Sequence, residues 1–91
     1  MSEDLRRSAE IRNSKGLHAR AAAKFCKMAA TFDAEIHVKK GPNEVSGSSI
    51  MGLMMLAASI GTTIEITTRG REATQAMDAL CKLVADKFDE E

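Results

Sequence analysis

The sequence predicts an α+β fold of two layers, an open-faced sandwich in which a four-stranded antiparallel sheet carries three helices on one face. Two observations predict it. Several segments alternate between apolar and polar residues, with the period of a strand that buries only one face. Other segments repeat apolar residues with helical spacing, and the resulting order along the chain is β-α-β-β-α-β-α.

The first strand and helix flank a loop. Ser8 to Arg12 is expected to form a short strand with Ala9 and Ile11 on one face. After the loop, which contains Gly16, Ala19 to Thr31 is expected to form a helix. Its apolar residues follow the spacing i, i+3, i+4, i+7 and comprise Ala22, Phe25, Cys26 and Ala29.

A hairpin and a short helix come next. Ala34 to Lys40 alternates cleanly, Gly41-Pro42-Asn43 is a turn signal, and Glu44 to Ser46 is placed to pair back as an edge strand. Ser48 or Ser49 then offers an N-cap for a brief apolar helix over Ile50 to Ala58, because a serine hydroxyl accepts from a first-turn N–H.

The last elements are a strand and the longest helix. Gly61 is a C-terminal stop for the short helix. Thr62 to Arg69 is rich in β-branched residues and predicts a strand. Arg71 to Phe88 carries a continuous apolar stripe and predicts a helix, after which Asp89-Glu90-Glu91 is expected to be a frayed acidic tail.

Length and composition exclude several classes of function. A chain of 91 residues is expected to form one domain over residues 1–91, without a deep enclosed cleft. Aromatic residues make up only 3%, and thirteen Lys and Arg balance thirteen Asp and Glu, so no nucleic-acid partner is expected.

The sequence predicts no membrane insertion, because the longest apolar stretch, Ile50 to Ala58, is about half the length of a membrane span. The acidic start, Met1-Ser2-Glu3-Asp4, is unlike a signal peptide, so a cytoplasmic location is expected.

The sequence predicts neither a metal site nor a redox site. His18, His37, Cys26 and Cys81 lie far apart in the sequence and lack the spacing of zinc ligands or of a redox pair. Both cysteines lie on or beside the apolar stripe of a helix and are expected to be free, buried thiols. His37 falls on the polar face of a strand and is expected to face solvent.

The neutral net charge hides an asymmetry. Residues 1–40 carry nine Lys and Arg against five Asp and Glu, whereas residues 41–91 carry four against eight. Within the first helix, Arg20, Lys24 and Lys27 share one face. A local basic field favours an acidic partner surface or a small anion, while a merely solvated helix face is the alternative.

His18 is singled out by its place immediately before the first helix. The first N–H groups of a helix have no intrahelical partner, and the helix dipole is positive there, so an anion beside His18 would find donors. Arg20 adds a guanidinium that suits phosphate. No carboxylate is close to His18 in the sequence, which indicates no catalytic triad. The choice is between a nucleophilic histidine in a phosphate cradle and a simple N-cap.

These residues carry a resemblance to a known family. Gly16-Leu17-His18-Ala19-Arg20 resembles the phosphorylation signature of the HPr family, the histidine-containing phosphocarriers of the bacterial phosphotransferase system. Ser49-Ile50-Met51-Gly52 resembles the family's second signature, and the resemblance covers about residues 8–88. Phe32-Asp33-Ala34-Glu35 and the acidic C-terminus look more like the nitrogen-related branch of the family.

The resemblance implies a carrier rather than an autonomous enzyme, without cofactor. Phosphorylated enzyme I would transfer a phosphoryl group to Nδ1 of His18, Arg20 would help to hold it, and an enzyme IIA-type protein would receive it. A monomer is expected. One residue departs from the family: Ala21 stands where proline is usual, which leaves the first helical turn less rigid.

The resemblance also implies sites beside the second signature. Ser49 matches a serine that a dedicated kinase phosphorylates in some lineages, although a capping role explains it without any kinase. The expected partner-binding residues are Lys24, Lys27, Ile50, Met51 and Met54. A short helix that is apolar all round exposes part of its surface, and exposed methionines suit docking. The alternative is that these residues belong to the core.

Two other classes of function stay open at this point. A ferredoxin-like ligand-sensing or interaction domain has a similar run of strands and helices, with the methionine-rich helix as a dimer face. A small RNA-binding domain would use the basic helix, but the scarcity of aromatic residues opposes it. Phosphorylation by enzyme I and phosphoenolpyruvate would distinguish the phosphocarrier from both.

Overall fold

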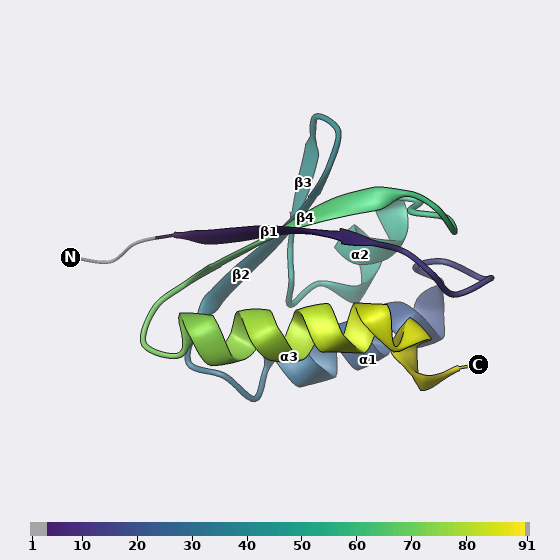
Figure 1. The fold of residues 1–91 in the computed structure, drawn as a ribbon. Coiled ribbons are helices and arrows are strands. Elements are labelled where there is room, and N and C mark those ends of the chain that lie inside the picture. The colour runs from purple at the N-terminus through teal and green to yellow at the C-terminus, as the bar shows by residue number, and fades with distance from the viewer. Residues whose placement is uncertain (1–3, 91) are drawn as a thin grey trace.

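The strands form one antiparallel sheet, as the sequence predicts. A computed structural model describes residues 4–90 of the chain. It contains the strands β1 (Leu5–Glu10), β2 (Glu35–Lys40), β3 (Asn43–Ser46) and β4 (Thr63–Arg69). Their spatial order is β1-β4-β2-β3, and every neighbouring pair is antiparallel (Figure 1). The predicted four-stranded sheet is therefore confirmed.

The helices pack on one side of this sheet. They are α1 (Ala19–Ala29), α2 (Ile50–Met55) and α3 (Ala73–Ala85), followed by a short turn η1 (Lys87–Asp89). Figure 1 shows α1 and α3 side by side beneath the strands, and α2 lies against α1 and the edge strand β3. The element order β-α-β-β-α-β-α and the two-layer architecture are confirmed.

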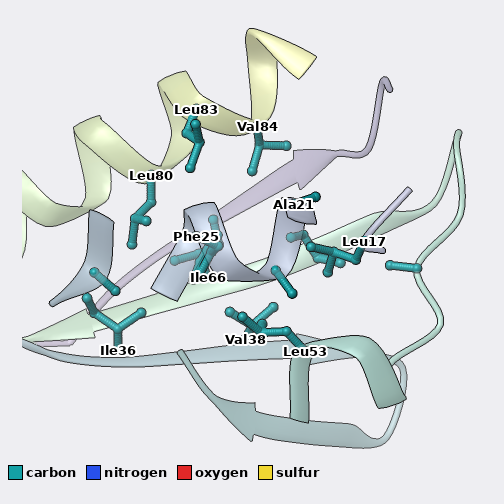
Figure 2. Packing of buried hydrophobic residues seen from close by; sticks show 14 of the residues in the cluster. Leu17, Ala21, Phe25, Ile36, Val38, Leu53, Ile66, Leu80, Leu83 and Val84 are labelled. Carbon is teal, nitrogen blue, oxygen red and sulfur yellow. The ribbon is translucent and has the colours of Figure 1, made fainter. Parts of the chain in front are cut away.

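The core lies between the helices and the inner face of the sheet. Burial alternates along the central strands, and Ile36, Val38, Ile64 and Ile66 are all buried. Phe25 of α1 is fully enclosed among side chains from the sheet and the other helices (Figure 2). Burying one large apolar side chain contributes about 1.5–3 kcal/mol, so this cluster holds the two layers together.

The first strand begins earlier than predicted. The sequence indicates Ser8 to Arg12, whereas β1 runs from Leu5 to Glu10. Pairing with β4 sets these bounds, because the paired residues run from Leu5 opposite Thr68 to Glu10 opposite Thr63. Ile11 lies just beyond the strand and is buried, as expected.

The predicted helices are too long at their C-terminal ends. α1 ends at Ala29 instead of Thr31, and α2 ends at Met55 instead of Ala58. Ala57 adopts a left-handed conformation with φ of 52°, which turns the chain away from the axis of α2. Only the tertiary position of the following loop explains that turn, since alanine has no preference for it.

The end of α3 departs most from the prediction. The helix stops at Ala85 instead of Phe88, and Lys87, Phe88 and Asp89 all have φ between 54° and 60°. Each left-handed residue costs about 1–2 kcal/mol, but the turn places the Phe88 side chain fully inside the core. Burial of this ring offsets much of the cost.

Three further expectations concern the termini and the cysteines. Residues 1–3 and Glu91 lie outside the described residues. Within residues 4–90, no helix is both long and apolar enough to cross a membrane. Cys26 and Cys81 are free, as predicted, but both are only partly buried, so the prediction of buried thiols is wrong in degree. Each packs against the edge of the hydrophobic core.

Candidate functional site at the start of the first helix

His18 is the N-cap residue of α1. Its backbone is extended, with φ of −77° and ψ of 178°, and its carbonyl accepts the first helical hydrogen bond from Ala22 N–H at 2.8 Å. The side chain is 27% exposed, so one edge of the ring is accessible. The structure therefore places His18 where the sequence predicts, at the positive end of α1.

The loop before His18 is held by a close contact with the segment after α2. Gly16 has φ of 66°, and a Cβ atom there would overlap the carbonyl oxygen of Ala58. Leu17 is buried, and its N–H donates to that same carbonyl oxygen at 2.9 Å. Only glycine accommodates both the left-handed backbone and the close approach, which explains why a glycine stands two positions before His18.

The two ring nitrogens of His18 face different partners. Nδ1 accepts from the backbone N–H of Arg20 at 3.3 Å, which is a long capping bond. Nε2 lies against the carboxylate of Glu90 in a short hydrogen bond. A neutral ring satisfies both contacts only when Nε2 carries the proton and Nδ1 carries the lone pair.

Glu90 is the functional-site residue that sequence reasoning missed. The expected frayed tail is wrong for this residue, because its side chain is only 14% exposed and lies beside His18. Asn13, which is fully buried, donates from Nδ2 to the Gly16 carbonyl oxygen at 2.8 Å and to Glu90 Oε1 at 3.0 Å. The only signal in the sequence was Phe88, an apolar residue two positions earlier that required burial.

The environment of Glu90 favours its ionised form. Burial raises the pKa of this carboxyl, but the hydrogen bonds from Asn13 and His18, together with the nearby charge of Lys24, outweigh burial. The pKa of Glu90 consequently lies below its ordinary value of 4.5. A carboxylate at this position is negative throughout the neutral range.

The lowered pKa of Glu90 predicts a pH-dependent stability. Stabilisation from a lowered carboxyl pKa is complete above the ordinary value of 4.5 and is lost as the pH falls through the folded-state value. We expect Glu90→Gln to lower the free energy of unfolding at neutral pH, and the difference from the parent chain should disappear as the pH falls through the lowered folded-state pKa of Glu90. Urea unfolding at several pH values measures this difference in the free energy of unfolding. Asp89→Asn is the matched control, because Asp89 is an exposed neighbouring carboxylate. An equal gap between Glu90→Gln and the parent at every pH would contradict this prediction.

A small pocket opens beside the histidine. It has a volume of about 270 Å³ and is lined by Ser14, Lys15, His18, Arg20, Lys24, Asp89 and Glu90. Its lining includes three bases and two acids, and the Arg20 N–H contacts Nδ1 whereas Glu90 contacts Nε2 on the other edge of the ring. The arrangement suits a small anion placed beside Nδ1.

The basic residues of α1 are in different environments. Arg20 and Lys27 are exposed. Lys24 is half-buried, and its Nζ donates to the backbone carbonyl of Phe88 at 2.6 Å. Lys24 thus fastens the C-terminal turn to α1, and its charge is only partly available to a partner.

The second predicted site surrounds the start of α2. Ser49 is its N-cap, and its Oγ accepts from Gly52 N–H at 2.9 Å. Ser48 instead exchanges a hydrogen bond with the hydroxyl of Ser46 at 2.8 Å, which decides between the two possible caps. Ser49 therefore has a structural role whether or not it is modified.

Four exposed apolar side chains of α2, hereafter the α2 patch, lie next to this cap: Ile50, Met51, Met54 and Met55. Met51 and Met55 are 68% and 78% exposed, whereas Leu53 of the same helix is fully buried. The prediction that part of this helix stays exposed is confirmed, and Met55, which was not among the predicted residues, is exposed as well.

The remaining candidates lie apart from His18. His37 alternates with buried residues on β2, and its Nε2 bonds Glu35 at 2.8 Å on the uncovered face of the sheet. Among residues 4–90, no group of three or more His, Cys, Asp or Glu side chains is placed to hold a metal ion.

Comparison with known proteins connects this geometry to one family. Residues 5–86 match the family model described as "PTS HPr component phosphorylation site". The chain is 50% identical over 86 residues to the phosphocarrier protein HPr of Neisseria meningitidis serogroup A, covering 94% of this chain and 97% of that protein. It is 46% identical over 86 residues to the phosphocarrier protein NPr of Shewanella violacea, covering 94% of each. The crystal structure of HPr-C-His from Thermoanaerobacter tengcongensis matches with a TM-score of 0.91 at 39% identity, covering 96% of this chain and 98% of that chain.

Proposed function

The chain belongs to the HPr family of the phosphotransferase system, and from this premise we propose that His18 accepts a phosphoryl group from phosphorylated enzyme I and passes it to an enzyme IIA-type protein. The chain acts as a monomeric carrier in the cytoplasm, over a single domain of residues 1–91. The observation that carries the proposal is the orientation of His18, whose Nδ1 faces the Arg20 N–H in the first turn of α1, beside a pocket that Lys15, Arg20 and Lys24 help to line.

The transfer needs little machinery within the carrier. The lone pair of Nδ1 attacks phosphorus, and the bond between phosphorus and the donor breaks, with its electron pair leaving on the donor. The backbone N–H of Arg20, which now bonds Nδ1 at 3.3 Å, is placed to turn to a phosphoryl oxygen. Donors and the helix dipole then stabilise the negative oxygens, and the guanidinium of Arg20 adds a charged donor.

Incubation of the purified chain with enzyme I and phosphoenolpyruvate tests this proposal. We expect intact-mass spectrometry to show the gain of one phosphoryl group, which acid removes. Subsequent addition of enzyme IIA proteins of the sugar-transport and nitrogen-related branches identifies the acceptor, since the identity to an HPr and to an NPr is similar. Absence of any acid-labile phosphoryl group after incubation would overturn the proposal.

Arg20 and Lys27 are expected to contribute differently to transfer. Lys27 is exposed and lies away from the pocket, so Lys27→Glu should slow association with an acidic partner by about threefold to tenfold at low salt. Added salt should remove this difference, because exposed charges are screened over about 8–10 Å. Arg20→Ala should also slow transfer at saturating enzyme I, since Arg20 lines the pocket. Stopped-flow transfer at several concentrations separates the two effects, and identical kinetic changes would contradict the distinction.

The α2 patch and Ser49 are proposed as a docking surface that a serine kinase is able to control. We expect Ser49→Asp to weaken binding to enzyme I by about tenfold, because the new charge lies beside apolar residues that are desolvated on binding. The fold should persist, since aspartate also serves as an N-cap. Titration calorimetry measures the affinity, and Thr74→Asp in the first turn of α3 is the control. Unchanged affinity for Ser49→Asp would exclude α2 from the interface.

A further inference from the structure

We propose that Glu90 is a positioning residue for His18, which orients the imidazole by accepting its Nε2–H and balances the positive charge that the ring acquires on phosphorylation. The first part depends only on the contacts in the structure. The second part rests on the proposed phosphocarrier function. Glu90 lies beyond residues 5–86, the part of the chain that the family model matches.

The hydrogen bonds at the two ring nitrogens agree with one another. A backbone N–H can only donate, so Nδ1 must accept from Arg20. A carboxylate can only accept, so Nε2 must donate to Glu90. The two contacts thus select the same protonation of a neutral ring and set its rotation about the Cβ–Cγ bond. The nucleophilic lone pair is left on Nδ1, toward the start of α1.

Asn13 holds the carboxylate in place. Both hydrogens of its Nδ2 are used, one on the Gly16 carbonyl and one on Glu90 Oε1. Its Oδ1 is buried and has no hydrogen-bond partner among the described residues. A buried oxygen without a hydrogen-bond partner lowers stability. The favourable contribution of Asn13 therefore comes from the two hydrogen bonds that its Nδ2 donates. Asn13 therefore couples the loop before His18 to the residue on the other side of the ring.

The C-terminal turn brings Glu90 to this position. Three consecutive left-handed residues, Lys87 to Asp89, reverse the chain after α3. The turn is fastened from two sides, by the fully buried ring of Phe88 and by the bond from Lys24 Nζ to the Phe88 carbonyl at 2.6 Å. Side-chain burial, a lysine tether and the Asn13 amide are independent attachments, and all of them converge on Glu90.

The charge balance of the transfer explains why a carboxylate is useful here. When Nδ1 of the neutral ring bonds to phosphorus, the donor leaves with the electron pair and Nε2 keeps its proton. The ring becomes positively charged in this step. Glu90 contacts the Nε2 edge, away from Nδ1, where it stabilises the ring charge with less repulsion toward the phosphoryl oxygens.

Nuclear magnetic resonance tests the orienting contact without any transfer partner. In the ¹⁵N-labelled chain we expect a downfield, slowly exchanging Nε2–H proton from His18. Glu90→Gln retains an oxygen acceptor and should keep this signal, whereas Glu90→Ala should lose it. Asp89→Asn is the matched control, because Asp89 lines the same pocket and is exposed, and asparagine also tolerates its left-handed backbone, so this replacement should leave the signal intact. A signal that is equally protected in Glu90→Ala would overturn the contact.

Kinetics tests the charge contribution. At saturating enzyme I, we expect Glu90→Gln to lower the rate constant and the equilibrium constant of phosphoryl transfer, each by about tenfold, the lower end of what hydrogen-bond partners of metal-bound histidines contribute. The KM for enzyme I should stay unchanged, which a general loss of structure would not produce. Rate and equilibrium equal to those of the parent chain would overturn the charge-balancing part. If the parent chain is itself not phosphorylated, the proposed function fails, while the Nε2–H measurement still decides the orienting contact.

Discussion

Replacement of His18 is expected to abolish phosphoryl acceptance from enzyme I. No other described side chain combines a nucleophilic nitrogen with the N-terminal end of a helix and a basic pocket. His18→Asn is the more informative variant, because an asparagine side chain also caps a helix, so the cap is kept while the nucleophile and its bond to Glu90 are removed. Transfer of ³²P from phosphoenolpyruvate in the presence of enzyme I measures the effect, and incorporation should fall to background.

His37→Ala is the matched control for this loss. His37 bonds Glu35 on the uncovered face of the sheet, so its removal should leave acceptance at the parent level. His18→Ala adds the loss of the cap, which costs about 0.5–2 kcal/mol of stability, and circular dichroism distinguishes that effect from the chemical one. Full phosphorylation of a folded His18→Asn variant would exclude His18 as the acceptor.

Replacement of Phe88 by alanine is expected to cause a large loss of stability. Phe88 is fully buried although it lies in the left-handed turn after α3. Deleting a buried phenyl ring costs about 3–5 kcal/mol, and here the ring is also what compensates an unfavourable backbone. Urea unfolding followed by circular dichroism should show a corresponding fall in the free energy of unfolding.

Phe32 provides the comparison for Phe88. It is only partly buried and packs at the margin of the core, so Phe32→Ala should cost clearly less. Phe88→Ala should additionally release Glu90 from His18, because the turn that positions the carboxylate loses its anchor. The Nε2–H signal of His18 should therefore disappear in Phe88→Ala while it persists in Phe32→Ala. Equal losses of stability in the two variants would contradict a special role for Phe88.

The local pattern of the sequence determined the elements and the start of the site. The alternation Ile36-His37-Val38 predicts a strand with one buried face, and the burial in the structure follows it. The position of His18 immediately before an amphipathic stretch predicts a histidine at a helix start. Both are short-range properties, since they depend on the periodicity of neighbouring side chains.

The sequence also determined the family. Gly16 to Arg20 and Ser49 to Gly52 are two motifs in the spacing of the HPr family, and comparison with known proteins confirms the membership. The first motif requires glycine at position 16 because a larger residue there would overlap the Ala58 carbonyl oxygen. That reason is visible only in the structure, because Ala58 is distant in the sequence.

Only the tertiary structure decided how the site is completed. The acidic end of the chain reads as a solvated tail, because three successive acids have no partner within their own segment. Glu90 instead meets His18 across 72 positions of sequence. The left-handed turn at Lys87 to Asp89 has little signal in residue preference, since lysine and phenylalanine disfavour that conformation and only aspartate tolerates it. The turn forms because the buried Phe88 ring and the Lys24 tether outweigh the local cost, and both attachments exist only once α1, α3 and the sheet have packed together.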